Sequence, residues 1–386
     1  MLSKIRVQHY KSLFDTEVDL EPLTILIGPN GSGKSNICEA LFVLSDFLQS
    51  LIANTSNFEL FPFFTQTIQK TSNNHPQIES KFWHGKLDYL TFEATSLNAS
   101  ENTSSGKFQD FLNIQVNYPQ RTLDIGKSQP NALKNLQVTR PNALKNLHST
   151  SQFRNFLISN EYSDSAIGNA LRKVDIYDFA PVDLSSKILS NEGMNKTGEG
   201  IVYALVDILH TNRKHFDELE ERLKRLVPNI QRILLPRGEN KTFLLELIDR
   251  YSEHHIPAAD ISDGTLRILA FLTALYQENT PSIICFEEIE NGVHPWLLHK
   301  MIELLKIVST EGIAGKPVQI LITTHSPVLL NYVEPHQVRA VELDNEGKTQ
   351  FHALPTDSKR FQKAMEAYDG ALGDLWFTNV FGGNPV

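Results

Sequence analysis

The stretch Leu23-Thr24-Ile25-Leu26-Ile27-Gly28-Pro29-Asn30-Gly31-Ser32-Gly33-Lys34-Ser35 decides the fold. Its first five residues form a nearly continuous apolar run, typical of a strand that is buried on both faces. Gly28 ends the run, and from Asn36 the apolar residues recur at helical spacing: Ile37, Ala40, Leu41, Leu44, Phe47, Leu48 and Leu51. The order of strand, glycine-rich turn and helix predicts that the chain opens with a βα unit.

The turn itself satisfies the pattern G-x-x-x-x-G-K-[ST], in the strand-to-helix context that this pattern requires. Its glycines allow backbone N–H groups to face phosphate oxygens, and the helix N-terminus adds partial positive charge. We therefore expect Lys34 to reach the β- and γ-phosphates of a nucleotide, and the Ser35 hydroxyl to ligate Mg²⁺. The predicted cradle comprises Gly31, Ser32, Gly33, Lys34, Ser35 and Asn36.

Two later strand ends carry polar residues that suit the same site. The apolar run 283–286 ends in Glu287 and Glu288, and two carboxylates at the end of a buried strand are costly unless they are used. Glu287 is expected to contact Mg²⁺ directly or through water, and Glu288 to deprotonate the attacking water. The alternative is an acidic pair at a helix N-terminus. On the next predicted strand, His325 either donates a hydrogen bond to the γ-phosphate or has a structural role.

A second anion site is indicated by the turn Ile261-Ser262-Asp263-Gly264-Thr265, which opens another helix. One nucleotide cannot easily use two such cradles on one subunit. A head-to-tail homodimer, in which this turn meets the γ-phosphate held by the partner's Lys34, is the natural arrangement. The acids follow Lys34 by 253 residues, so a large segment must separate the halves of the site.

The fold class expected is α/β, with a mostly parallel central sheet, N-terminal antiparallel strands and an α+β insertion. We assign residues 1–60 and 250–386 to the nucleotide-binding domain and residues 61–249 to the insertion. The insertion contains expected strands near 87–94 and 112–116, an amphipathic helix before Pro228 and a basic hairpin-like stretch. The sequence PNALKNL occurs twice within 130–147, which we interpret as a duplicated surface loop.

Composition describes a folded soluble protein of 386 residues, 41% hydrophobic and 21% charged. No apolar run approaches the ~18 residues of a membrane span, and we expect a cytoplasmic protein without a membrane partner. The two cysteines, Cys38 and Cys285, lie in apolar segments typical of reduced core residues. The net charge of −9 argues against a protein whose whole surface is basic and binds nucleic acid. However, the segment 121–160 is locally basic, because it contains only one acidic residue, Asp124. Its six basic residues are Arg121, Lys127, Lys134, Arg140, Lys145 and Arg154.

Taken together, these motifs resemble the ABC-type ATPases of the SMC, RecF and OLD group, most closely the stand-alone ATPases whose turn reads SDGTLR. The resemblance covers about the first 50 residues and 260–386. It implies ATP and Mg²⁺ as cofactors, a dimer-contacting loop at 290–292 and a composite site. One subunit would supply Asn30, Lys34, Ser35, Glu287, Glu288 and His325, and the other Ser262, Asp263 and Gly264. The turn reads ISDGT and not LSGGQ, and the Mg²⁺-sensing glutamine is not identified, Gln77 being a weak candidate.

The resemblance favours an ATP-hydrolysing switch whose dimerisation controls an effector, such as a nuclease or toxin, or nucleic-acid engagement, in DNA repair or anti-phage defence. The alternative is a RecF-like clamp on DNA, with the basic segment 121–160 and Arg232, Arg237 and Lys241 at the phosphates. A transporter ATPase is disfavoured by the ISDGT turn. We expect the chain to be the ATPase head alone, without long coiled-coil arms or a nuclease domain.

Overall fold

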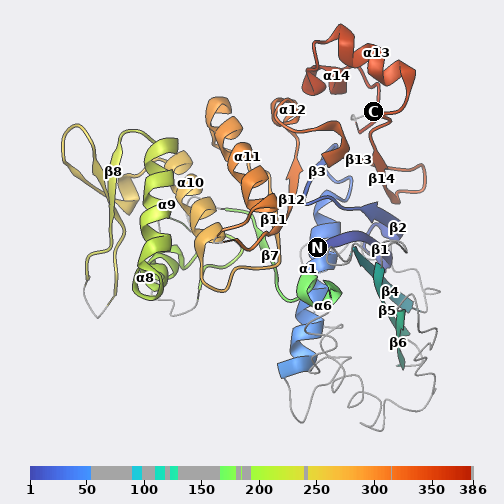
Figure 1. Ribbon diagram of the computed structural model, residues 1–386, viewed down its shortest axis with the longest axis horizontal. Helices are drawn as coiled ribbons and strands as arrows, with labels where there is room; N and C mark the ends of the chain where they lie inside the picture. Colours follow the sequence, from blue (N-terminus) through green and yellow to red (C-terminus); the bar gives the residue numbers. More distant parts are fainter. Residues whose placement is uncertain are drawn as a thin grey trace.

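The computed structural model describes most of the two expected chain ends and part of the middle (Figure 1). The described residues are 1–53, 89–97, 109–117, 122–128, 166–179, 184, 193–238, 242–313 and 315–383. Gln77, the duplicated loop 130–147 and most of the basic segment 121–160 lie outside these residues, so the expectations placed on them stay predictions.

A six-stranded sheet forms the centre of the described part of the chain, in the order β14-β13-β3-β12-β11-β7. All neighbouring pairs are parallel except β13 and β14, which are antiparallel. The bounds are β3 (Leu23–Ile27), β7 (Val174–Tyr177), β11 (Ile283–Glu287), β12 (Gln319–Thr324), β13 (Val338–Leu343) and β14 (Thr349–Ala353). The expected α/β class with a mostly parallel central sheet is confirmed.

Both faces of this sheet are covered, so that every residue of β3 and β12 is buried. Successive residues of a strand point to opposite faces. In β11, Ile283 and Cys285 pack on one side with α1 (Lys34–Ala53), whereas Ile284 and Phe286 pack on the other side with α10 (Asp263–Tyr276). Cys38 and Cys285 are both fully buried and reduced, as expected.

A second sheet begins at the N-terminus and runs β2-β1-β4-β5-β6, antiparallel throughout. Its strands are β1 (Leu2–Tyr10), β2 (Leu13–Asp19), β4 (Tyr89–Leu97), β5 (Gln109–Asn117) and β6 (Thr122–Ser128). The N-terminal antiparallel strands are thus confirmed, and strands occur at both expected places, 87–94 and 112–116. Within this sheet, β4 pairs with β1, so the strands from the middle of the chain extend the sheet that begins at the N-terminus.

In Figure 1, α8, α9, α10 and β8 gather at the end of the molecule away from the N-terminal sheet, whereas α12, α13 and α14 lie above the sheets. Helix α9 ends just before Val227 and Pro228, as its pattern predicts. The basic hairpin-like stretch forms a small antiparallel sheet β10-β9-β8. The bounds are α6 (Ala166–Ala170), α8 (Ile201–Thr211), α9 (Arg213–Leu226), α11 (Pro295–Thr310), α12 (Pro327–Leu330), α13 (Lys359–Ala367), α14 (Leu372–Phe377), β8 (Ile230–Leu234), β9 (Glu246–Asp249) and β10 (His255–Pro257).

The expected insertion 61–249 contributes to both large sheets. Strands β4–β6 join β1, and β7 forms an edge of the central sheet beside β11. The division into 1–60 with 250–386 and 61–249 therefore stays a prediction about domains, although part of the middle segment completes the site-bearing sheet. Among the described residues, none of the helices has the length and apolar character needed to cross a bilayer.

The two large sheets are joined by the buried side chain of Gln319, at the start of β12. Its Oε1 accepts a hydrogen bond from the Leu2 N–H (2.8 Å), and its Nε2 donates to the Leu2 carbonyl (2.7 Å) and the Glu21 carbonyl (3.1 Å). Because the Gln319 side chain is fully buried, water could not take its place as the hydrogen-bond partner of these backbone groups.

We predict that Gln319→Leu lowers the free energy of unfolding by about 1–3 kcal/mol, because it leaves buried backbone groups without partners. The matched control is Gln362→Leu, at an exposed position of α13. Chemical denaturation of both variants measures the effect. Equal stability of Gln319→Leu and the unchanged protein would contradict the proposed junction.

Candidate nucleotide-binding site

The predicted phosphate loop joins β3 to α1 and is closely surrounded by backbone. Gly31 and Gly33 have positive φ angles of 76° and 96°, a region in which side chains are strained. A Cβ atom on Gly28 would collide with the Val341 carbonyl oxygen, and one on Gly33 with the Thr349 hydroxyl. The glycines of the motif are therefore required by the turn itself, and they leave Asn30 and Gly31 exposed at its tip.

Two hydroxyl groups from outside the loop, those of Ser12 and Thr349, hold it in place through hydrogen bonds. The Asn36 amide donates to Ser12 Oγ (2.6 Å), which lies 2.6 Å from Thr349 Oγ1. Thr349 Oγ1 in turn donates to the Ser32 carbonyl (2.9 Å). Ser12 lies between β1 and β2, and Thr349 begins β14, so residues far apart in the sequence fix the loop's shape.

Lys34 is buried and directs its ammonium back into the loop. Its Nζ donates to the Gly28 carbonyl (2.9 Å) and the Pro29 carbonyl (2.8 Å). Burial lowers the pKa of Lys34 to about 8, although Glu288 and Glu290 act to raise it. Lys34 thus lies within the electrostatic reach of two acids that follow β11, Glu288 and Glu290.

Glu287, the expected Mg²⁺ ligand, ends β11 with a side chain that is only 9% exposed. Its Oε2 forms an ion pair with Lys196 Nζ at 2.5 Å. Burial acts to lower the pKa of Lys196, but the Glu287 carboxylate outweighs it and the pKa is raised. Asp178, directly after β7, faces the same charges: burial and the Glu287 carboxylate raise its pKa.

Glu288, the expected base, has a left-handed backbone with φ 48°, uncommon for a residue other than glycine. The conformation is held by its N–H, which donates to the Thr323 carbonyl (2.9 Å), and by Asn291 Nδ2, which donates to Glu288 Oε2 (2.6 Å). Backbone strain of this kind is common at functional sites, where the surrounding structure maintains it.

His325 lies beside Glu288, with 3.6 Å between His325 Nε2 and Glu288 Oε1. Burial, and secondly the Lys34 charge, lower the pKa of His325. Its backbone N–H donates to Glu290 Oε1 (2.9 Å), which also accepts from the Thr324 hydroxyl (2.7 Å). Glu290 thereby joins the loop after β11 to the end of β12.

The turn Ser262-Asp263-Gly264 lies apart from this cluster, at the start of α10. Ser262 Oγ caps the helix by accepting from the Thr265 N–H (3.3 Å). A Cβ on Gly264 would lie 2.7 Å from the Gly292 carbonyl oxygen, so the turn packs closely against the loop that follows the acids. Across the described residues, no hydrogen bond or ion pair joins this turn to the phosphate loop of the same chain.

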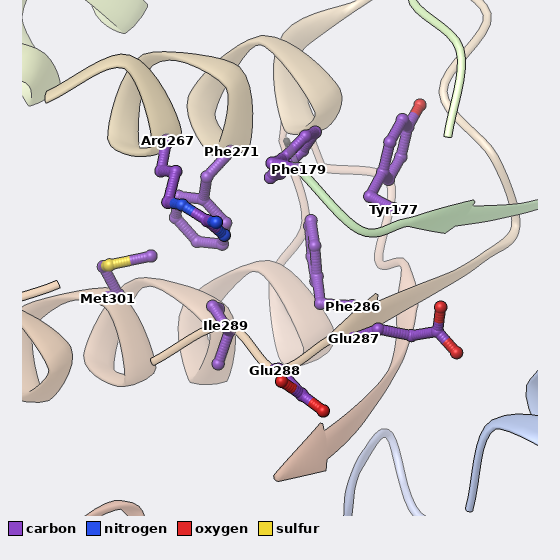
Figure 2. Close-up of a pocket in the computed structure, with 9 residues that line it drawn as sticks. All are labelled: Tyr177, Phe179, Arg267, Phe271, Phe286, Glu287, Glu288, Ile289 and Met301. Carbon is purple, nitrogen blue, oxygen red and sulfur yellow. The ribbon is translucent and has the colours of Figure 1, made fainter. Parts of the chain in front are cut away.

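An apolar pocket lies between α10 and the end of β11, as Figure 2 shows. The rings of Tyr177, Phe179, Phe271 and Phe286 gather there, with Phe271 and Phe286 centred 5.2 Å apart. Glu287 and Glu288 point away from these rings (Figure 2). The aromatic cluster fixes β7, β11 and α10 relative to one another, so that the acids project from a rigid base.

The residues present fit a nucleotide with Mg²⁺. The buried Ser32 Oγ and Glu290 Oε2 have no hydrogen-bond partner within the part of the chain that the structure describes. The loop precedes a helix N-terminus, a position that favours anions, and Ser35 and Glu287 offer the oxygen ligands that Mg²⁺ prefers.

Four residues of this arrangement were not found from the sequence: Ser12, Thr349, Asp178 and Lys196. Ser12 and Thr349 are single hydroxyls in polar turns and carry no pattern. Asp178 follows the short apolar alternation of β7, a signal that was available. Lys196 reaches Glu287 only through tertiary packing.

The family profile described as "AAA domain, putative AbiEii toxin, Type IV TA system" matches residues 23–331. Among curated proteins, an "ATP/GTP phosphatase" of Helicobacter pylori is 23% identical over 372 residues, which span 86% of this chain and 88% of that protein. A RecF "DNA replication and repair protein" of Streptococcus agalactiae is 26% identical over 34% of each chain.

Two further similarities concern a short segment and the fold. An "OLD nuclease" of Thermus scotoductus is 42% identical over 52 residues, 13% of this chain and 10% of that protein. A solved SMC head bound to the C-terminal winged helix domain of ScpA superposes with a TM-score of 0.54, at 14% identity, covering 92% of this chain and 98% of that one.

We predict that Thr349→Val weakens nucleotide binding about fivefold, since it removes the hydroxyl that holds the Ser32 carbonyl while keeping the side chain's shape. Thr349→Ser, which retains the hydroxyl, is the matched control. Titration of each variant with a fluorescent ATP analogue measures the affinity. An unchanged affinity in Thr349→Val would show that the brace does not shape the loop.

Proposed function

This chain belongs to the AAA domain family matched above, as a P-loop ATPase of the RecF, SMC and OLD type, and on that premise we propose that it hydrolyses ATP in a composite site formed by two copies. One observation carries the proposal. Lys34, Glu288, Glu290 and His325 gather at one edge of the central sheet, whereas the Ser262–Gly264 turn is a separate anion-favouring element. The "ATP/GTP phosphatase" relative supports hydrolysis as the reaction.

In the proposed reaction, each group acts from the position described. A bound Mg²⁺ would supply positive charge that offsets the charge of the phosphates. Lys34 would leave its two carbonyl partners for the phosphates, and Ser35 and Glu287 would hold the ion. Glu288 would take the proton of the attacking water, and His325, 3.6 Å away, would donate to the γ-phosphate.

The partner's turn would complete the site. The N–H groups at the start of α10, with Ser262, Asp263 and Gly264, would face the γ-phosphate of the other copy. Because Gly264 packs on Gly292, the loop after the acids would lie at the same contact. Dimerisation would then depend on ATP, which makes the protein a switch for an effector, such as a nuclease or toxin, in DNA repair or defence.

We predict opposite behaviour for two single variants. Lys34→Ala loses nucleotide, because no other cation of the loop replaces its charge. Glu288→Gln retains ATP and accumulates a dimer, because the water loses its base while the phosphate contacts remain. Light scattering with ATP and Mg²⁺ measures the mass of each variant. A monomeric Glu288→Gln protein under saturating ATP would refute the composite site.

A DNA clamp is the second candidate, favoured by the RecF relative and by Arg232 and Arg237, which are exposed on and just after β8. The Glu288→Gln dimer is the species to offer to single-stranded, duplex and junction DNA. Retention that weakens steeply with salt would support a clamp. If the dimer is not retained on any of these DNAs at low salt, the clamp is contradicted, and a switch that acts on a protein effector is favoured.

A further inference from the structure

The ion pair between Lys196 and Glu287 places a cation at the carboxylate that the proposed function gives to Mg²⁺. The two atoms, Lys196 Nζ and Glu287 Oε2, are 2.5 Å apart, and Glu287 is nearly buried. Mg²⁺ binds carboxylate oxygens at about 2.0–2.1 Å and requires near-octahedral geometry. An ammonium and a divalent ion at one carboxylate would repel each other strongly in such an environment.

Lys196 is held at this place by the fold. Its carbonyl accepts from the Asp178 N–H (2.8 Å), which anchors the turn 193–200 to the end of β7. The Asn195 side chain accepts from the N–H groups of Thr197 and Glu199, both at 3.0 Å, and so shapes the turn. The turn then leads directly into α8, which packs against α9 and α10.

We propose that the Lys196 ammonium competes with Mg²⁺ for the Glu287 carboxylate. It pairs with Glu287 in the nucleotide-free protein and must be displaced when Mg²⁺ and nucleotide bind. The inference rests on the proposed function and deepens it. Displacement frees the turn 193–200 at its contact with Glu287. Because α8 packs on α10, the arrival of the metal ion is thereby coupled to the helix that carries the Ser262–Gly264 turn.

The test measures Mg²⁺ dependence and not turnover. A fluorescent, non-hydrolysable ATP analogue is held at fixed concentration, and Mg²⁺ is varied. In Lys196→Met, half-saturating Mg²⁺ is expected about tenfold lower than in the unchanged protein, because the competing ammonium is gone; tenfold corresponds to ~1.4 kcal/mol. Lys196→Arg keeps the charge and is expected within about twofold of the unchanged protein.

A matched control is Lys224→Met, which removes a lysine paired with Glu220 and Glu221 on α9, away from the acids. Its Mg²⁺ dependence is expected to be unchanged. If Lys196→Met needs as much Mg²⁺ as the unchanged protein, the inference is overturned. A need for more Mg²⁺, or weaker nucleotide binding, also overturns it and would mean that Lys196 contacts the phosphates.

A second measurement needs no variant. Hydrogen exchange of the peptide that spans 193–200 is expected to be faster with nucleotide and Mg²⁺ than with nucleotide and EDTA. Equal or slower exchange would overturn the inference even if Lys196→Met does not fold. The proposed function fails separately, if the unchanged protein retains no nucleotide at any Mg²⁺ concentration and behaves like Lys34→Ala.

Discussion

Parallel pairing of β3, β12 and β11 is the constraint on which the site depends, because it brings three distant strand ends to one level. The register pairs Ile27 with Thr324, and Thr323 with Glu287. The residues that follow these ends are the phosphate loop, His325 and Glu288. Since the carboxyl ends of parallel strands meet at one sheet edge, a one-residue slip in either pairing would move the candidate site residues apart.

This constraint also explains why the convergence of these strand ends could be predicted from the sequence. The strands β3, β11 and β12 each contain an apolar run and are each followed by a polar motif, and the glycine spacing 28–33 specifies the turn after β3. The pairing of β7 with β11 could not be predicted, because Ile283 pairs with the distant Val174 and such pairing leaves no periodic signal in the sequence. The braces at Ser12 and Thr349 escaped for a related reason: a single hydroxyl acquires its role only when distant strands meet.

In the described site, Lys34 and Glu287 each have partners within the chain. Lys34 is turned onto its own loop carbonyls, and Glu287 is neutralised by Lys196. Both contacts satisfy a charge that burial would otherwise make costly. Binding of the nucleotide with its metal ion would exchange both sets of partners at once, so the free energy of binding is partly spent on rearranging the protein. Under the proposal made above, that exchange would provide a physical route from the ligand to the turn 193–200 and to α10.

The central claim is that two copies build each site, and mixing two inactive variants tests it most directly. Lys34→Ala would lack a working phosphate loop, and Ser262→Arg would place a bulky cation on the exposed turn that we propose faces the partner. Each alone is expected to be inactive. In a mixed dimer, the intact loop of one copy meets the intact turn of the other, so ATP turnover is expected to reappear on mixing, at one of the two sites. No recovery of turnover, although mixed dimers form, would contradict the composite site.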